Sequence, residues 1–128
     1  MTLKDNLYKI EATDIDARRV ELSLIPDCVI YRAHFPGRPI TPGVCIIQTA
    51  TELLEHLTGR PTELRGLANA KFLAVVDPTI SARVCYTFKK ISPADAEETI
   101  KVAVVVEGKD DSGSDITFTK LSLLCHQK

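Results

Sequence analysis

The sequence predicts an α+β fold in which a curled antiparallel sheet wraps around one long central helix. Residues 44–57 contain no glycine or proline and begin with an apolar run, which is typical of a buried helix. Two stretches before this helix and four after it are patterned as strands. Regular alternation of strands with helices, the mark of parallel doubly wound folds, is absent. A long apolar helix followed by an antiparallel meander is buried most easily by a sheet curled around it, so we expect residues 1–128 to form a single domain.

The chain is predicted to open with a β-hairpin between Asn6 and Ile25. The segments LYKIEA and RRVELSLI alternate apolar and polar residues at period two. The intervening TDIDA is rich in side chains that bond their own backbone, which favours a turn. Residues 26–33 then form a connecting loop in which Val29, Ile30 and Tyr31 are expected to pack on the core.

The central helix has recognisable start and stop signals. Pro42 suits the first helical turn, where no amide donor is needed, and Thr41 before it is the expected N-cap. Gly59 tolerates the left-handed conformation that closes a helix. Because residues 44–47 are all apolar, we expect the first half of the helix to be wrapped by other parts of the chain. Cys45, Gln48, Glu52 and Glu55 share one stripe of the helix, at 100° per residue.

Four further strands are expected after the helix. Turn signals separate them, namely the Asp77-Pro78 pair, residues 92–96 and the polar run GKDDSGS. The predicted strands are Glu63–Val76, Thr79–Ile91, Thr99–Glu107 and Asp115–Cys125.

Composition excludes several classes of function. The net charge is -1 with 26% charged residues, so no global field attracts nucleic acid or an anionic membrane. No apolar run approaches the roughly 20 residues of a membrane span, and MTLKDNLYK has no hydrophobic stretch of signal-peptide length, so we expect a cytoplasmic protein.

The four cysteines are widely separated without a CxxC pair, and no histidines or carboxylates have zinc-ligand spacing. We therefore expect buried thiols and no metal.

Residues 34–52, HFPGRPITPGVCIIQTATE, form the candidate site. One histidine, three prolines and two glycines gather here, which indicates a rigid, irregular loop leading into the helix. The free amides of the first helical turn carry partial positive charge and would polarise a carbonyl oxygen placed against Gly43 and Val44. A histidine, an amide-rich helix start and a polar helix stripe are thus close in sequence.

This segment closely resembles the signature of the 3-hydroxyacyl-(acyl carrier protein) dehydratases, His-Phe-Pro-Gly-x-Pro-x-x-Pro-Gly followed by a glutamate on the helix. His34, Phe35, Pro36, Gly37, Pro39, Pro42 and Gly43 match it in type and spacing. Residues 66–79, GLANAKFLAVVDPT, give a weaker second match to the strand and turn after the helix. The resemblance implies a hotdog fold, assembled as a dimer of identical or related subunits that share their sites, and no cofactor.

One position departs from the family pattern. Gln48 stands where the family has its glutamate, and Glu52 stands one turn later, where a glutamine is common. The residue that donates a proton to the leaving hydroxyl is therefore unassigned, whereas the histidine of the family pattern is present as His34. An imidazole has an unperturbed pKa of about 6.5 and is competent as both base and acid. Of the other histidines, His56 and His126 are expected at the surface.

The resemblance also implies roles for other residues. Gly43 would let the thioester oxygen approach the helix amides, beside Pro42 and Val44. Phe35, Ile40 and Phe72 would line an acyl tunnel. Since the family takes its substrates from an acidic carrier protein, exposed cations near the site would dock that carrier. Arg38 and Lys71 are the expected pair.

Three functions follow from this sequence. The leading one is dehydration of 3-hydroxyacyl groups on an acyl carrier protein to trans-2-enoyl thioesters. The second is a hotdog thioesterase that recruits a carboxylate such as Glu52 to activate water, although the HFPGRP loop argues against it. The third is a weakened subunit that supports an active partner, which Gln48 keeps open.

Overall fold

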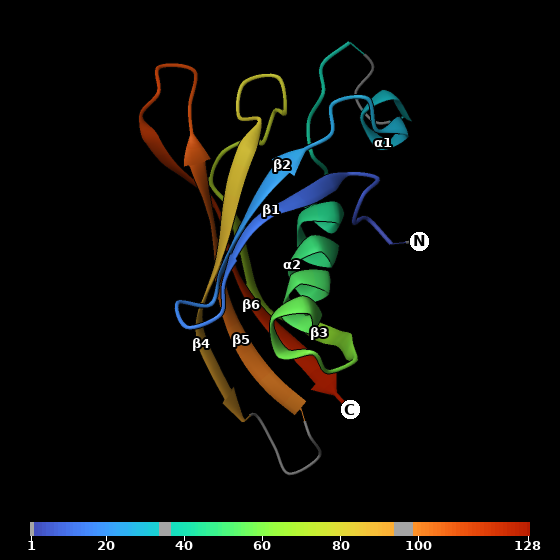
Figure 1. The fold of residues 1–128 in the computed structure, drawn as a ribbon, viewed down its shortest axis with the longest axis vertical. Coiled ribbons are helices and arrows are strands. Elements are labelled where there is room, and N and C mark those ends of the chain that lie inside the picture. Colours follow the sequence, from blue (N-terminus) through green and yellow to red (C-terminus); the bar gives the residue numbers. More distant parts are fainter. Residues whose placement is uncertain (1, 34–36, 94–98) are drawn as a thin grey trace.

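A single antiparallel sheet and one long helix dominate the computed structural model, which describes residues 2–33, 37–93 and 99–128. Within those residues the sheet has six strands in the order β1-β2-β4-β5-β6-β3, and every neighbouring pair is antiparallel. Figure 1 shows the long helix α2 lying along one face of the curled sheet, beside β1 and β3. The predicted fold class is confirmed. The elements are β1 Tyr8–Asp14, β2 Arg19–Leu24, α1 Val29–Ala33, α2 Gly43–Thr58, β3 Thr62–Phe72, β4 Arg83–Pro93, β5 Thr99–Lys109 and β6 Asp115–Gln127.

Helix α2 buries one face against the sheet. Its buried side chains are Cys45, Ile46, Thr49, Ala50, Leu53 and Leu54. Leu53 and Leu54 are fully buried, and each such leucine stabilises the fold by about 1.5–3 kcal/mol. Alternate residues of β5 and β6 supply the opposing apolar surface, which includes Val104 and Leu123. Period-two alternation in those strands therefore encodes the wall of the core.

The start of α2 is less enclosed than the sequence indicated. Val44 is 73% exposed, and Gln48 one turn later is exposed as well. The end of the helix is as predicted, because Gly59 adopts the left-handed conformation (φ 69°) and its N–H donates to the Glu55 carbonyl at 2.8 Å. The expectation of a fully wrapped upper helix is wrong for this single chain, because Val44 and Gln48 are exposed while Cys45 and Ile46 are buried.

The expected N-cap is also different. Pro42, in an extended conformation, occupies the N-cap position, and no side chain caps the helix. Thr41 instead hydrogen-bonds through its hydroxyl to the Tyr31 hydroxyl at 2.9 Å. Tyr31 belongs to the short helix α1 in a segment predicted as a loop, because five residues are too few to show a helical period. Burial raises the pKa of Tyr31 to about 12, so its hydroxyl stays protonated.

Strand β3 ends four residues earlier than predicted. After Phe72, the amides of Leu73 and Ala74 both donate to the Phe118 carbonyl, and the chain leaves the ladder with β6. The Val76 carbonyl then accepts a hydrogen bond from the Thr41 amide at 2.8 Å. Residues 73–76 therefore run beside the loop before α2 instead of continuing the sheet.

Strand β4 begins four residues later than predicted. Asp77 accepts hydrogen bonds from the amide and hydroxyl of Thr79 through its side chain. Its carbonyl accepts from the amides of Ile80 and Ser81. Residues 79–81 are thus held in a turn, a use of aspartate that competes with strand formation.

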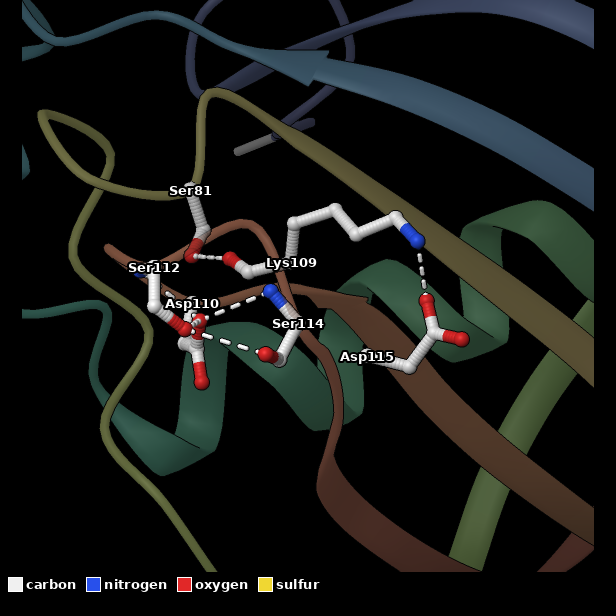
Figure 2. Close-up of polar contacts among 6 residues, drawn as sticks. All are labelled: Ser81, Lys109, Asp110, Ser112, Ser114 and Asp115. Carbon is white, nitrogen blue, oxygen red and sulfur yellow. Dashed lines mark hydrogen bonds and ion pairs between the residues drawn. The ribbon is translucent and has the colours of Figure 1, made fainter.

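The turn between β5 and β6 is tied down by local polar contacts, drawn in Figure 2. The Asp110 carboxylate accepts hydrogen bonds from Ser112 and Ser114, and those donors lower the pKa of Asp110. The Ser81 hydroxyl donates to the Lys109 carbonyl and joins this turn to the one before β4 (Figure 2). These bonds account for the turn without any ligand.

The described residues contain no membrane-spanning helix and no metal-ligating cluster. No helix there is long and apolar enough to cross a membrane. No group of three metal-ligating side chains occurs in residues 2–33, 37–93 and 99–128. His126, expected at the surface, lies half-buried in β6, where it pairs with β3 and β5.

Candidate active site

The N-terminus of α2 presents two backbone amides that have no acceptor in residues 2–33, 37–93 and 99–128. Cys45 and Ile46 both donate to the Pro42 carbonyl, at 3.0 and 3.1 Å. The amides of Gly43 and Val44 precede these bonds and donate to no group among the described residues. Free first-turn amides carry partial positive charge. They are suited to hold an oxygen that gains negative charge during a reaction.

Phe72 lies directly against Gly43. A Cβ atom placed on Gly43 would approach the Phe72 ring to 2.9 Å at Cζ. The φ angle of Gly43 is not positive, so its need for glycine comes from this close approach. Phe72 is the last residue of strand β3, and it is 51% exposed. Gly43 and Phe72, both predicted as site residues from the sequence, are thus in direct contact.

An apolar hollow opens beside this contact. Its volume is about 530 Å3, within the usual range for small-molecule sites. Ile40 was expected to line it. The sequence pattern does not indicate Ile46 or residues 73–76 as part of the site, since it predicts a strand through residues 73–76. The lining residues are Ile40, Thr41, Gly43, Ile46 and Phe72–Val76.

Gln48 and Glu52 form a hydrogen-bonded pair on α2. The Gln48 Nε2 donates to the Glu52 Oε2 at 2.9 Å. The two residues lie four apart, the spacing that brings side chains together on a helix. Cys45, placed on the same stripe by the sequence, is buried instead, and burial raises the pKa of its thiol.

The Glu52 carboxylate also anchors the N-terminal segment. Its Oε2 accepts from the Leu3 amide at 2.9 Å, and its Oε1 accepts from the Lys4 amide at 3.0 Å and the Tyr8 hydroxyl at 2.8 Å. Burial, and next the bond to Glu52, raise the pKa of Tyr8, so this hydroxyl remains a donor. With Gln48, four donors meet the roughly four lone-pair positions of one carboxylate.

The remaining predicted site residues are separated or outside the described part of the chain. His34 and Phe35 lie outside the described residues. Arg38 is exposed and lines a second hollow with Tyr31 and Pro39. Lys71 is exposed on β3, directly opposite Lys120 of β6, so two like charges repel across the ladder.

A family model describes this chain over most of its length. Residues 10–109 match the ApeI-like family, described as ApeI dehydratase. Two relatives carry the name 3-hydroxyacyl-(acyl-carrier-protein) dehydratase FabZ. The one from Latilactobacillus sakei subsp. sakei (strain 23K) is 26% identical over 125 residues, covering 92% of this chain and 86% of the relative. The one from Ligilactobacillus salivarius (strain UCC118) is 30% identical over 96 residues, covering 70% and 67%.

A solved structure supports the same fold. The dehydratase heterocomplex ApeI:P from Xenorhabdus doucetiae aligns with a TM-score of 0.57 at 16% identity. The alignment covers 86% of this chain and 88% of that chain. Together with the antiparallel sheet and the central helix, this similarity confirms the predicted hotdog fold.

Proposed function

Because the chain belongs to the ApeI-like dehydratase family, we propose that it is a lyase acting on 3-hydroxyacyl thioesters. It removes water from acyl groups held on an acyl carrier protein and releases trans-2-enoyl thioesters for fatty acid or related acyl biosynthesis. The observation that carries this proposal is the helix start. The Gly43 and Val44 amides have no acceptor among the described residues, and Gly43 lines an apolar hollow of about 530 Å3.

The geometry fits an elimination next to a polarised carbonyl. The thioester oxygen binds the Gly43 and Val44 amides, and the acyl chain occupies the hollow past Phe72. His34 then removes the proton from carbon 2. The electron pair forms the double bond to carbon 3 as the carbon–oxygen bond breaks, and the departing hydroxyl takes a proton to leave as water.

Gln48 limits the protonation step in this scheme. An amide can hold the substrate hydroxyl but does not donate a proton as an acid. His34 is the proton source in our proposal, taking the proton from carbon 2 and returning it to the oxygen. Loss of one acid–base partner typically costs about 10² to 10⁴ in rate, so we expect a slow dehydratase.

The contacts of Glu52 favour dehydration over thioester hydrolysis. A thioesterase would need a carboxylate that is open to a water molecule. Both Glu52 oxygens instead accept hydrogen bonds from Leu3, Lys4, Tyr8 and Gln48. Glu52 is therefore suited to structural support of the helix.

We further propose that the chain works as a dimer with an identical or related hotdog subunit. Strand β3 is an edge of the sheet, and apolar side chains are exposed along and just beyond it, including Leu67 and Leu73. Such an edge pairs readily with another strand. Arg38 and Lys71 are our proposed docking residues for the acyl carrier protein. The cytoplasmic location expected from the sequence stays a prediction.

One assay separates the three functions derived from the sequence. The purified chain is incubated alone with a 3-hydroxyacyl carrier-protein thioester, and enoyl product and free thiol are both followed. Enoyl product without free thiol supports the dehydratase. Free thiol identifies a thioesterase. No product from the chain alone, with turnover restored by a co-expressed homologue, identifies a supporting subunit and overturns our proposal.

A further inference from the structure

Thr41 is held through both its backbone and its side chain. Its amide donates to the Val76 carbonyl at 2.8 Å, and its hydroxyl hydrogen-bonds to the Tyr31 hydroxyl at 2.9 Å. All three residues are buried, so water does not compete for either bond. Thr41 thus joins helix α1 and the segment after β3 to the start of α2, since only Pro42 separates it from Gly43.

The position of Thr41 bears directly on the direction of the first α2 amide. Pro42 follows Thr41, and its ring locks the φ angle, which is -62°, so the chain cannot turn freely between Thr41 and the helix. The Pro42 carbonyl is held by two donors, the Cys45 and Ile46 amides. Because a trans peptide unit is planar, this carbonyl and the Gly43 N–H point in opposite directions. The Gly43 N–H is therefore directed away from the helix by groups that are fixed on both sides of it.

The Tyr31 side chain is the fixed end of this arrangement. Helix α1 lies at the end of the molecule where α2 begins (Figure 1). The Tyr31 amide donates to the Cys28 carbonyl at 3.1 Å, and both residues are buried. Breaking the bond between Tyr31 and Thr41 would leave two buried hydroxyls unpaired, which is unfavourable. A reacting group is placed accurately when its supporting residues are themselves held in this way.

We propose that Tyr31 is a positioning residue for dehydration, acting through Thr41 on the amides that start α2. The bond between the two hydroxyls sets the position of Thr41, and Thr41 sets the direction of the amides that follow it. Those amides hold the thioester oxygen as it gains negative charge. This inference rests on the proposed dehydratase function, and it adds a residue of α1 to those that determine the rate.

The first test compares Tyr31→Phe with Thr41→Val, since each removes one hydroxyl with little change in shape. We expect each to lower kcat for enoyl formation by about tenfold, the size of one lost hydrogen bond. KM should stay within about twofold, because the amides stabilise the transition state more than the bound substrate. Thr41→Ser keeps a hydroxyl and should restore most of the loss seen in Thr41→Val. Unchanged kcat in Tyr31→Phe and Thr41→Val would overturn the proposal.

The double variant Tyr31→Phe/Thr41→Val shows whether the two hydroxyls act as one unit. Because they bond to each other, removal of the second hydroxyl should add little, and the total loss of kcat should stay near about tenfold. A loss of about 100-fold, the product of two single effects, would mean that the hydroxyls act independently and would contradict the proposal.

Tyr8→Phe is the matched control for a merely structural role. It also removes a buried tyrosine hydroxyl that bonds to α2, because Tyr8 donates to the Glu52 Oε1 at 2.8 Å in the second half of the helix. Tyr8→Phe and Tyr31→Phe should both lower the urea midpoint of unfolding, but only Tyr31→Phe should lower kcat. Equal losses of kcat would show a general loosening of the fold and refute a positioning role for Tyr31.

A second readout does not require turnover. The chain has six glycines, so selective isotope labelling of glycine nitrogen gives few amide resonances, and that of Gly43 is the one lost in Gly43→Ala. This resonance should shift in Tyr31→Phe and Thr41→Val but stay in place in Tyr8→Phe. If it stays in place in all three variants, Tyr31 does not act on the helix start and the inference fails. If it shifts as expected while the wild type forms no enoyl product, Tyr31 orients the amide but the dehydratase proposal fails.

Discussion

Substitution of Gly43 by alanine should impair catalysis more than stability. An added Cβ would lie 2.9, 3.1 and 3.3 Å from the Cζ, Cε1 and Cε2 atoms of Phe72. Ordinary carbon contacts are about 3.5–4.0 Å, so the closest overlap is roughly 0.6 Å or more. Since Phe72 is 51% exposed, its ring has room to move. We expect a stability loss of about 1 kcal/mol, the low end for overpacking, and a Tm lower by roughly 3–5 °C.

The effect on activity has a different cause. The new methyl group would stand where the thioester oxygen approaches the Gly43 amide. Loss of one such donor costs about 10² to 10³ in rate, so kcat/KM for enoyl formation should fall about 100-fold in Gly43→Ala. The assay follows enoyl product from a 3-hydroxyacyl carrier-protein thioester, with Tm measured on the same samples.

Phe72→Ala provides the background that separates the two effects. Without the ring, Gly43→Ala should no longer lower Tm, whereas its loss of kcat/KM relative to Phe72→Ala should remain. Retention of full kcat/KM by Gly43→Ala in the wild-type background would refute the reasoning, because the reacting oxygen would then bind elsewhere.

Three further predictions test the assembly and the core. Light scattering should show a dimer, weakened by Leu67→Lys on the β3 edge; a stable, active monomer would contradict this. Thr119 is fully buried, and its hydroxyl has no hydrogen-bond partner among the described residues. Thr119→Val should therefore raise the free energy of unfolding in urea by about 1 kcal/mol, whereas a lower value would show that the hydroxyl has a partner. Burial raises the pKa of Cys125 from 9.0 to about 11. As pH rises, the thiol of the unfolded chain therefore loses its proton before the thiol of the folded chain does. The free energy of unfolding should be highest below pH 9.0 and decline toward pH 11. The decline should be less steep in Cys125→Ala, and equal declines in the two proteins would exclude this cause.

Local patterns in the sequence were sufficient for most of the fold. The alternation in β5 and β6 and the glycine that ends α2 depend on residues close in sequence, and both predictions are confirmed. The end of β3 was placed wrongly because a distant contact decides it. The Val76 carbonyl pairs with the Thr41 amide, on the far side of the helix in sequence. No period within residues 63–76 encodes that partner.

The site was predictable to a similar extent. The stripe that joins Gln48 to Glu52 follows from helical spacing, and the close approach of Phe72 to Gly43 agrees with the roles expected of both. The anchoring of Glu52 was missed, since its donors Leu3, Lys4 and Tyr8 come from 44 to 49 residues away. Sequence spacing alone left Glu52 open as a catalytic acid, whereas the fold surrounds it with donors.

The central claim is that this chain dehydrates 3-hydroxyacyl thioesters with His34 as its base. The most direct measurement is kcat/KM for enoyl formation by the purified wild type, His34→Ala and His56→Ala, the last being an exposed histidine bonded to Thr13. We predict turnover by the wild type and His56→Ala that rises with pH as an imidazole loses its proton, and none by a folded His34→Ala. Near-full dehydration by His34→Ala with normal folding would contradict the account.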